Sequence, residues 1–442
     1  MKKYDKYKPS GVEWIGEIPE EWEAKRLKYF LTRNDGGVWG NDYDGITANA
    51  TKVFRSTEIN IDGSWNMEKK PALRVLSDHE KEKALLKEGD LLVTKSSGSQ
   101  LHIGKTALVN KMIEEQECCY SNFMQRLRPL NLKASKFLHI FLNSNLSRDQ
   151  YNYLSNSTTG LANLSANLIN EIILPCPTPE EQTAIANYLD DKTEKIDTLI
   201  EKKKKLIELY KEERTAVINQ AVTRGINPLA PTGNVKLKDS GIDWLGQIPE
   251  HWEVKKLKYV AKLRDELIDE SDFKIAVENI ESGTGKLVGM EEDKNYQGKL
   301  SAFRNGDTIF NKLRPYLHKV YYAEQDGGLF GELLIIYSIS ELLPKFLFYK
   351  LFSKIFIDIV DGSTQGTKMP RANWNDFISL LAISFPKDKD EQLQVVQHIE
   401  TETKRIDGSI SKIEKEIDLL AEYRTALISE VVTGKIDVRN AV

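Results

Sequence analysis

Two short segments contain the residue types found at nucleotide and metal sites. The segment "GSQLHIGKT", which starts at Gly98, resembles a phosphate-binding loop. That motif needs four residues between its first Gly and the Gly-Lys pair, because the backbone amides must wrap around the phosphates. Five residues lie between Gly98 and Gly104. The segment "EEDK", from Glu291, contains the Glu-x-Lys tail of some metal-dependent nucleases but lacks a positioned upstream carboxylate. We therefore predict neither a nucleotide site nor a nuclease centre in these segments.

The other residue types that support catalysis are scattered along the chain. The six His have no metal-ligand spacing, and the three Cys (Cys118, Cys119 and Cys176) lack the CxxC spacing of a zinc or redox site. Thiols without a disulfide pattern fit a reducing compartment. We expect no catalytic residue, no cofactor and no metal ion in this chain.

Length, composition and charge limit the class of protein. A chain of 442 residues is too long for one ordinary core, so we predict two or three domains. No apolar stretch approaches the roughly 18 residues that span a bilayer, and no export signal follows Met1, so we expect a cytoplasmic protein. The net charge of −4 lacks the excess of basic residues that is typical of nucleic-acid-binding proteins. Any such binding would depend on local patches or on partner subunits.

The chain repeats itself in two blocks. "SGVEWIGEIPEEWEAKRLKYF", from Ser10, recurs as "SGIDWLGQIPEHWEVKKLKYV", from Ser240, with 13 of 21 positions identical. A second block starts at Glu181 and recurs at Glu391, and the same offset of 210 matches two "ID" pairs and two "RTA" triplets. Repeats of this kind indicate repeated structural units. We predict a tandem of two units, each with a globular part and a helical part, in which the repeated Trp residues pack structurally.

Both helical parts have a heptad pattern. Apolar residues recur in steps of three and four for about five heptads, which predicts long helices of roughly 60 Å. The first stripe includes Ile196, Leu199 and Leu206, and the second includes Ile406 and Ile413. The run of Lys202 to Lys205 is most simply a solvated face.

The order of the parts predicts an arrangement. Short β-type runs bounded by Gly and Asn, with a few short helices, predict globules of the α+β class. The predicted boundaries are 1–176 for the first globule, 177–226 for the first helix, 227–386 for the second globule and 387–442 for the second helix. Because the linker after the first helix is short, the two helices are expected to run antiparallel as a coiled coil. A pseudo-twofold axis would relate the two units, with the globules at opposite ends.

Several segments resemble one known family over essentially the whole chain. They are the paired "W[IL]G[EQ]IPExWE" segments, the "LPCPTPEEQ" entry to the first helix, the run "GDTIFNKLRPYLHKV" and the "RTA" near each helix end. In these segments the chain is similar to the specificity subunit of type I restriction-modification systems. The second helix entry, "FPKDKDEQ", departs from the proline-rich form of that family.

The resemblance implies a non-catalytic subunit that reads DNA. Each α/β target-recognition domain would bind one half of a bipartite, interrupted site in double-stranded DNA, and the helices would fix the gap. The helices would also dock two methyltransferase (modification) subunits, which use S-adenosylmethionine, and through them restriction/translocase subunits, which use ATP and Mg²⁺. The alternative is a coiled-coil scaffold that joins two protein-binding domains. That alternative explains the repeat but not why the two globules differ between their shared segments.

Direct readout of DNA needs side chains that reach base edges, flanked by positive groups near phosphates. In the second globule the run Asn311–Lys319 alternates such residues with Leu. If the run is extended, these share one face: Lys312, Arg314, Tyr316 and His318. The loop "STQGTKMPR" adds three more: Gln365, Lys368 and Arg371. An ordinary polar sheet face would have the same composition.

The first globule offers two further segments of this kind. The loop "TKSSGSQ" contributes Lys95, Ser96, Ser97, Ser99 and Gln100. The run "YSNFMQRLR" contributes Ser121, Asn122, Gln125 and Arg126. "STTG", from Ser157, occupies the place that "STQG" holds in the second unit, so the two loops are expected to approach DNA equivalently.

Overall fold

The computed structural model describes most of the chain and divides it into two compact units. The described residues are 2–45, 50–154, 162–226, 236–290, 298–339, 341–364 and 369–441. The first unit combines residues 1–202 with residues 416–442, and the second contains residues 203–415. Each unit therefore holds one globule, part of helix α6 (Pro179–Arg224) and part of helix α9 (Lys389–Val432). The mixture of helices and strands agrees with the predicted α+β class.

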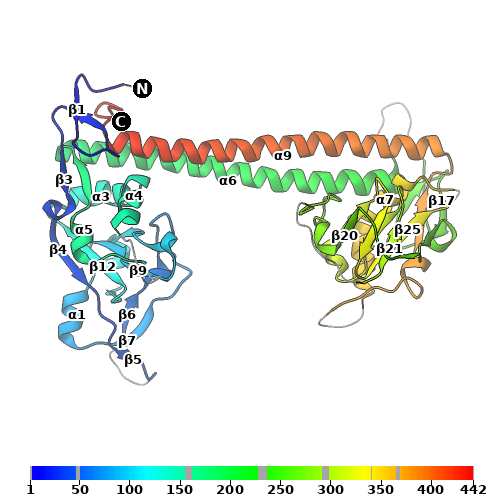
Figure 1. Ribbon diagram of the computed structural model, residues 1–442, viewed down its shortest axis with the longest axis horizontal. Coiled ribbons are helices and arrows are strands. Elements are labelled where there is room, and N and C mark those ends of the chain that lie inside the picture. The colour runs from blue at the N-terminus through cyan, green and yellow to red at the C-terminus, as the bar shows by residue number, and fades with distance from the viewer. Residues whose placement is uncertain are drawn as a thin grey trace. The chain divides into compact units, whose positions relative to one another are not determined.

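The globule in the first unit combines short strands with short helices (Figure 1). The strands are β1 (Tyr7–Pro9), β2 (Glu17–Pro19), β3 (Glu23–Arg26), β4 (Leu31–Gly36), β5 (Asn41–Asp42), β6 (Ala50–Phe54), β7 (Ala72–Val75), β8 (Leu91–Thr94), β9 (Ser96–Ser97), β10 (Thr106–Leu108), β11 (Cys119–Tyr120), β12 (Met124–Pro129), β13 (Ala162–Asn163) and β14 (Ile173–Cys176). The helices are α1 (Asp78–Ala84), α2 (Lys111–Glu114), α3 (Ser135–Leu142), α4 (Asn145–Leu154) and α5 (Ala166–Asn170). Two four-stranded sheets result, in the orders β10-β8-β12-β4 and β11-β6-β7-β5.

The globule of the second unit also has two four-stranded sheets. One has the same strand order as its counterpart in the first globule, and the other has a different order. Its strands are β15 (Leu237–Asp239), β16 (Gln247–Pro249), β17 (Glu253–Lys256), β18 (Ala261–Leu263), β19 (Leu267–Ile268), β20 (Lys274–Ala276), β21 (Leu300–Phe303), β22 (Thr308–Asn311), β23 (Val320–Tyr322), β24 (Gly327–Phe330), β25 (Leu333–Ser338) and β26 (Ala382–Phe385). Its helices are α7 (Pro344–Phe352) and α8 (Lys354–Gly362). The sheet β18-β25-β22-β23 repeats the order of β4-β12-β8-β10.

The second sheet of each globule keeps only a parallel pair in common. β11 pairs with β6, and β24 pairs with β20, in both cases parallel. In the first unit β7 and β5 extend this pair on the side of β6, whereas in the second unit β21 and β19 extend it on the side of β24. The two globules therefore have one four-stranded sheet and one parallel pair in common, and they differ in the strands that extend the pair.

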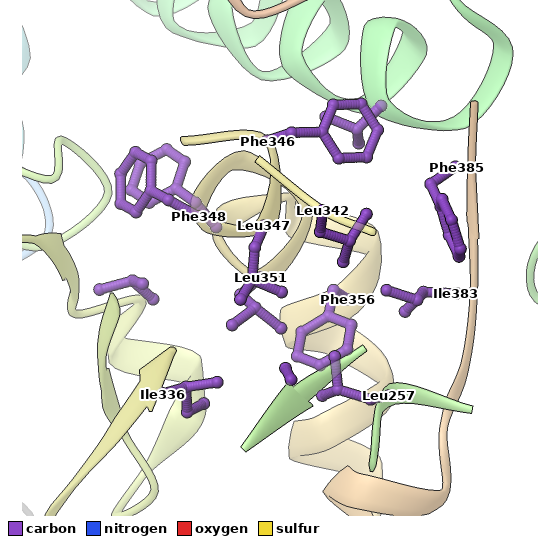
Figure 2. Close-up of a cluster of buried hydrophobic side chains, with 14 of the residues drawn as sticks. Leu257, Ile336, Leu342, Phe346, Leu347, Phe348, Leu351, Phe356, Ile383 and Phe385 are labelled. Carbon is purple, nitrogen blue, oxygen red and sulfur yellow. The ribbon is translucent and has the colours of Figure 1, made fainter. Parts of the chain in front are cut away.

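The core of the second globule packs directly against the helices of its unit. The aromatic and aliphatic side chains of α7, among them Phe346 and Leu347, lie with Leu257 and Ile383 in one cluster (Figure 2). The same cluster includes residues near the end of α6 and the start of α9. Burial of these side chains, at about 1.5–3 kcal/mol each before entropic costs, fixes the globule to its helical segments.

The repeated Trp residues fix each globule to the start of a helix. Trp22 is buried and donates a hydrogen bond from Nε1 to Glu181 Oε2 (3.1 Å), and Trp252 donates in the same way to Glu391 Oε1 (2.8 Å). β3 pairs with β14 just before α6, and β17 pairs with β26 just before α9. The two repeated sequence blocks therefore meet in space, which explains why they recur together.

Within each unit, α6 and α9 are joined by an ion pair between repeated residues. In the first unit Arg424 binds Asp197 through two hydrogen bonds (2.9 and 3.2 Å). In the second unit Arg214 Nε donates to Asp407 Oδ1 (3.1 Å). Each pair joins the Arg of an "RTA" triplet to the Asp of the "ID" pair on the other helix. The repeated charged residues thus have the same structural role in both units.

None of the helices in the described part of the chain combines the length and hydropathy that a membrane-spanning segment needs.

The Glu181→Ala variant is expected to lose about 2–4 kcal/mol of unfolding free energy in the first unit. Besides Trp22, the Glu181 carboxylate accepts hydrogen bonds from the Tyr4 hydroxyl (3.2 Å) and the Thr178 backbone N–H (3.0 Å). Removing it leaves buried donors unpaired, at about 1–3 kcal/mol each. Urea unfolding would measure the change. Glu180→Ala, at the exposed neighbouring position, is the control, and an equal loss in both variants would contradict the prediction.

Candidate nucleic-acid interface

In the first unit, three segments that are distant in sequence form one surface. The segment after β8 hydrogen-bonds to the turn between β11 and β12, because the Phe123 carbonyl accepts from the N–H groups of Lys95 (3.1 Å) and Ser96 (3.3 Å). β9 pairs with β13, with Ser96 opposite Asn163, and the Leu164 N–H donates to the Lys95 carbonyl (2.7 Å). Two of the polar segments predicted from sequence are therefore adjacent. We call this the first three-segment surface: residues 95–99, 121–123 and 162–164.

The predicted residues of this surface differ in exposure. Ser99 and Asn122 are exposed, and three others are half-buried: Lys95, Ser96 and Ser97. The side chain of Gln100 lies outside the described part of the structure, as does the "STTG" segment. The exposed amide and hydroxyl groups, with the ammonium group of Lys95, are of the types that contact base edges and phosphates.

Three predicted contact residues are buried instead. The Ser121 side chain is fully buried, and Gln125 donates from Nε2 to Asn34 Oδ1 (2.6 Å). Arg126 is 1% exposed, and its guanidinium donates to Asp35 Oδ2 (2.7 Å) and to two backbone carbonyls. The structure therefore places these three predicted side chains inside the globule, where protein groups bind Gln125 and Arg126, and not on its surface.

The second unit has an equivalent surface. The Ala372 N–H donates to the Lys312 carbonyl (2.9 Å), as the Leu164 N–H does to that of Lys95. The bridge between Leu313 and Arg371 corresponds to the pairing of β9 with β13. Lys95 and Lys312 therefore hold corresponding positions. We call residues 312–314, 330–332 and 370–372 the second three-segment surface.

The run Asn311–Lys319 is not extended, which corrects the predicted alternation. β22 ends at Asn311, and Pro315–Leu317 form a 3-10 helix. Arg314 (φ 52°) and His318 (φ 50°), on either side of it, have left-handed backbone conformations. Pro315 locks its own φ and cannot donate a strand hydrogen bond, so the strand cannot continue through it. The four predicted side chains therefore do not share one strand face.

The predicted residues of this run have separate environments. His318 packs against Phe352, whose carbonyl lies 2.6 Å from His318 Nε2, and burial lowers the pKa of His318. Tyr316 is exposed, while Lys312 and Arg314 are half-buried. His318 is therefore bound within the globule, whereas Tyr316 remains accessible to a ligand.

Arg371 is the exposed cation of the second three-segment surface. Its Nη2 lies 2.6 Å from Glu332 Oε2, and Glu332 stands in the turn between β24 and β25. The other two residues predicted in this loop, Gln365 and Lys368, lie outside the described residues. Sequence reasoning missed Glu332, as it missed Asn163 and Phe123 of the first surface, because neither pattern nor spacing marks these positions.

The segment from Gly98, which resembles a phosphate-binding loop in sequence, contains a lysine with a structural role. Lys105 is buried, and its Nζ donates to the carbonyl of Ile59 (2.6 Å) and to that of Ser56. Burial lowers the pKa of this lysine. Its ammonium therefore stabilises the turn after β6 and is directed into the globule.

The chain is similar to known specificity subunits in sequence. Residues 19–209 match the family model described as type I restriction modification DNA specificity domain. The type I restriction enzyme EcoDI specificity subunit of Escherichia coli is 24% identical, over 90% of this chain and 86% of that protein. The MjaVIII specificity subunit of Methanocaldococcus jannaschii is 24% identical, over 96% and 95%.

Solved structures share the fold. One chain, from work on complex assembly and conformational transition of the type I R-M system, is 14% identical, with a TM-score of 0.67 over 95% of this chain and 99% of that one. The HsdS subunit from Thermoanaerobacter tengcongensis is 13% identical, with a TM-score of 0.56 over 95% and 98%. Residues 19–209 match the specificity-domain model, and over nearly its whole length the chain is similar in sequence to specificity subunits of type I restriction-modification systems and shares the fold of such structures.

Proposed function

We propose that each unit reads one half of a bipartite, interrupted DNA site through its three-segment surface. The observation that carries this proposal is that both units build the same surface from corresponding segments but place different side chains on it. Asn163 of the first surface corresponds to Arg371 of the second, since Asn163 pairs with the segment that follows β8 and Arg371 pairs with the segment that follows β22. A shared scaffold with different polar groups is the arrangement needed to read two different half-sites.

The side chains suit separate tasks in recognition. Lys95 and Lys312 hold corresponding positions, so they are suited to phosphate contacts that are common to both halves. Arg371 can donate two hydrogen bonds to the major-groove edge of guanine, and Glu332 can accept from the amino group of cytosine. Asn163 presents an amide, the group that pairs with adenine. The half-sites would differ because these groups differ.

The helices would set the gap and dock the enzymes. We infer that α6 and α9 form an antiparallel coiled coil that fixes the distance between the two recognition surfaces, as dimeric readers match half-site spacing to their own geometry. Two equivalent helical surfaces would accept two copies of one methyltransferase subunit. Restriction subunits would join through them, and S-adenosylmethionine, ATP and Mg²⁺ would bind in those partners.

Exchange of one recognition region tests the proposal. Residues 31–170 would be replaced by the corresponding region of another specificity subunit, which keeps Trp22, Glu181 and the pairing of β3 with β14. Adenine methylation would then be mapped in cells that carry the chain and its partners. We expect one half of the methylated motif to change while the other half and the gap stay the same.

The control is the reciprocal exchange in the second unit, at residues 261–378, which should change only the other half. A motif in which both halves change, or neither, would contradict the proposal. The scaffold alternative predicts that the complex has no steeply salt-dependent affinity for DNA. Filter binding at several salt concentrations separates the two.

A further inference from the structure

An exposed aromatic ring stands at the tip of the first three-segment surface. Phe123 is 54% exposed, although the residues on either side of its turn, Tyr120 and Met124, are completely buried. The exposed residue Asn122 precedes it, and the segment that begins at Lys95 lies beside it. The only apolar residue of this turn that faces solvent is therefore surrounded by groups that suit nucleic acid.

The backbone that carries this ring is held firmly. The Met124 N–H donates to the Ser121 carbonyl (2.9 Å) and closes a tight turn with Asn122 and Phe123 at its centre. The Phe123 carbonyl accepts from both Lys95 and Ser96. A ring with two side-chain torsions on a fixed turn loses little entropy when it binds.

The corresponding position in the second unit has different chemistry. Met124 lies opposite Thr94 in the pairing of β12 with β8, and Leu333 lies opposite Asn311 in the pairing of β25 with β22. The preceding residues, Phe123 and Glu332, therefore correspond. Glu332 binds Arg371. The tip of the turn is apolar in one unit and charged in the other, although its scaffold is the same.

We propose that Phe123 inserts as a wedge at one base step of the half-site read by the first unit. The proposal rests on the proposed function of that surface. Exposed Phe side chains next to polar groups can enter a base step and partly unstack it, and the cost of unstacking depends on the sequence of the step. The first unit would thus read part of its half-site through deformability, whereas the second unit uses hydrogen bonds at the same place.

The test uses the complex of this chain with its methyltransferase partners and a DNA duplex that carries its mapped motif. 2-Aminopurine, whose fluorescence rises on unstacking, would replace single bases across the first half-site. We expect a rise at one step other than the methylated adenine, and its loss in Phe123→Ala. That variant should bind this duplex roughly ten- to a hundredfold more weakly, and Phe123→Leu should keep most of both effects.

Two controls make the outcome decisive. Leu130→Ala removes an exposed apolar side chain just beyond the other end of β12 and should change neither readout. The fluorescence at the methylated adenine should persist in Phe123→Ala, which shows that the complex is intact. If the wild type binds the half-site but no signal depends on Phe123, the wedge is wrong and the proposed function stands. If the wild type does not distinguish this half-site from other DNA, both are wrong.

Discussion

Replacing Arg126 by Ala lowers the free energy of unfolding of the first unit by an expected 3 kcal/mol or so, because it breaks an ion pair whose arginine is buried and whose aspartate is half-buried. The guanidinium binds Asp35 and the carbonyls of Lys83 and Leu85, and it lies 5.6 Å from the centre of the Tyr120 ring. Alanine leaves that carboxylate and both carbonyls without their charged donor. Urea unfolding, followed by hydrogen exchange in the first unit, measures the loss.

Arg33→Ala is the matched control for this prediction. Arg33 approaches the same carboxylate of Asp35, at 3.9 Å, but is exposed, so its removal should change stability by no more than about 0.5 kcal/mol. If Arg126→Ala were as stable as the wild type and changed the methylated motif instead, then Arg126 would contact DNA and its structural assignment would be wrong.

Lys350→Met is expected to raise the free energy of unfolding of the second unit by about 1–3 kcal/mol at pH 7.5. The Lys350 side chain is 1% exposed, and its Nζ donates to two neutral acceptors, the Val222 carbonyl (2.5 Å) and Ser384 Oγ (3.0 Å). Burial lowers the pKa of Lys350 to about 7. Methionine has a similar length and no charge to desolvate, and it forgoes two hydrogen bonds worth about 1 kcal/mol each.

The pH dependence identifies the cause of this effect. The pKa of Lys350 is about 7 in the folded state, against 10.5 for a lysine in water. Between these values the unfolded chain holds a proton that the folded chain has lost, so the stability of the wild type rises with pH by up to about 1.4 kcal/mol per unit. The Met variant lacks this contribution, and its advantage should shrink between pH 7.5 and 9.5.

The control for pH is Lys354→Met, four residues further along, at the start of α8. Lys354 is exposed and pairs with Asp358 (2.7 Å), so its removal should leave the pH profile parallel to that of the wild type. Chemical unfolding at three pH values measures all three proteins. Parallel profiles for the wild type and Lys350→Met would contradict the lowered pKa of the buried Lys350 side chain.

The helices show both the reach and the limit of periodicity. The heptad pattern predicted long helices, and α6 and α9 have 46 and 44 residues. The same pattern placed Leu199 and Leu206 in the apolar seam, yet they are 42% and 40% exposed, whereas Ile196 is buried. A pattern identifies one side of a helix, but how much of that side is covered depends on the width of the partner.

The globules were less predictable where their sequences differ. The repeated Trp and Glu residues predicted a shared scaffold because both copies preserve the same residue types. The placement of β7 and β21 on opposite sides of the parallel pair was not predictable, since the segments between the shared strands have no common pattern. Pairing over such distances depends on the complete globule.

Composition found the segments of the candidate interface but not the side chains that face outward. Arg126 and Phe123 stand three positions apart in one run, and residue types favour the arginine for DNA. In the structure Arg126 is buried, because its guanidinium donates hydrogen bonds to Asp35 and to two backbone carbonyls. Phe123 is exposed at a turn. In the second unit, Pro315 ended a strand that the alternating pattern had suggested. Orientation depended in each case on neighbours that are distant in sequence.

The first unit is built from both ends of the chain, so it cannot complete its fold until the C-terminal segment has been synthesised. Leu427 and Val431, from the end of α9, share a core with Trp22 and Ile185. After residue 202 has been synthesised, the first globule still lacks the part of its apolar core that the end of α9 supplies. More than two hundred further residues must be translated before that part is available. A premature stop codon after residue 415 would therefore do more than shorten the C-terminus. It would remove core side chains from the unit that is synthesised first.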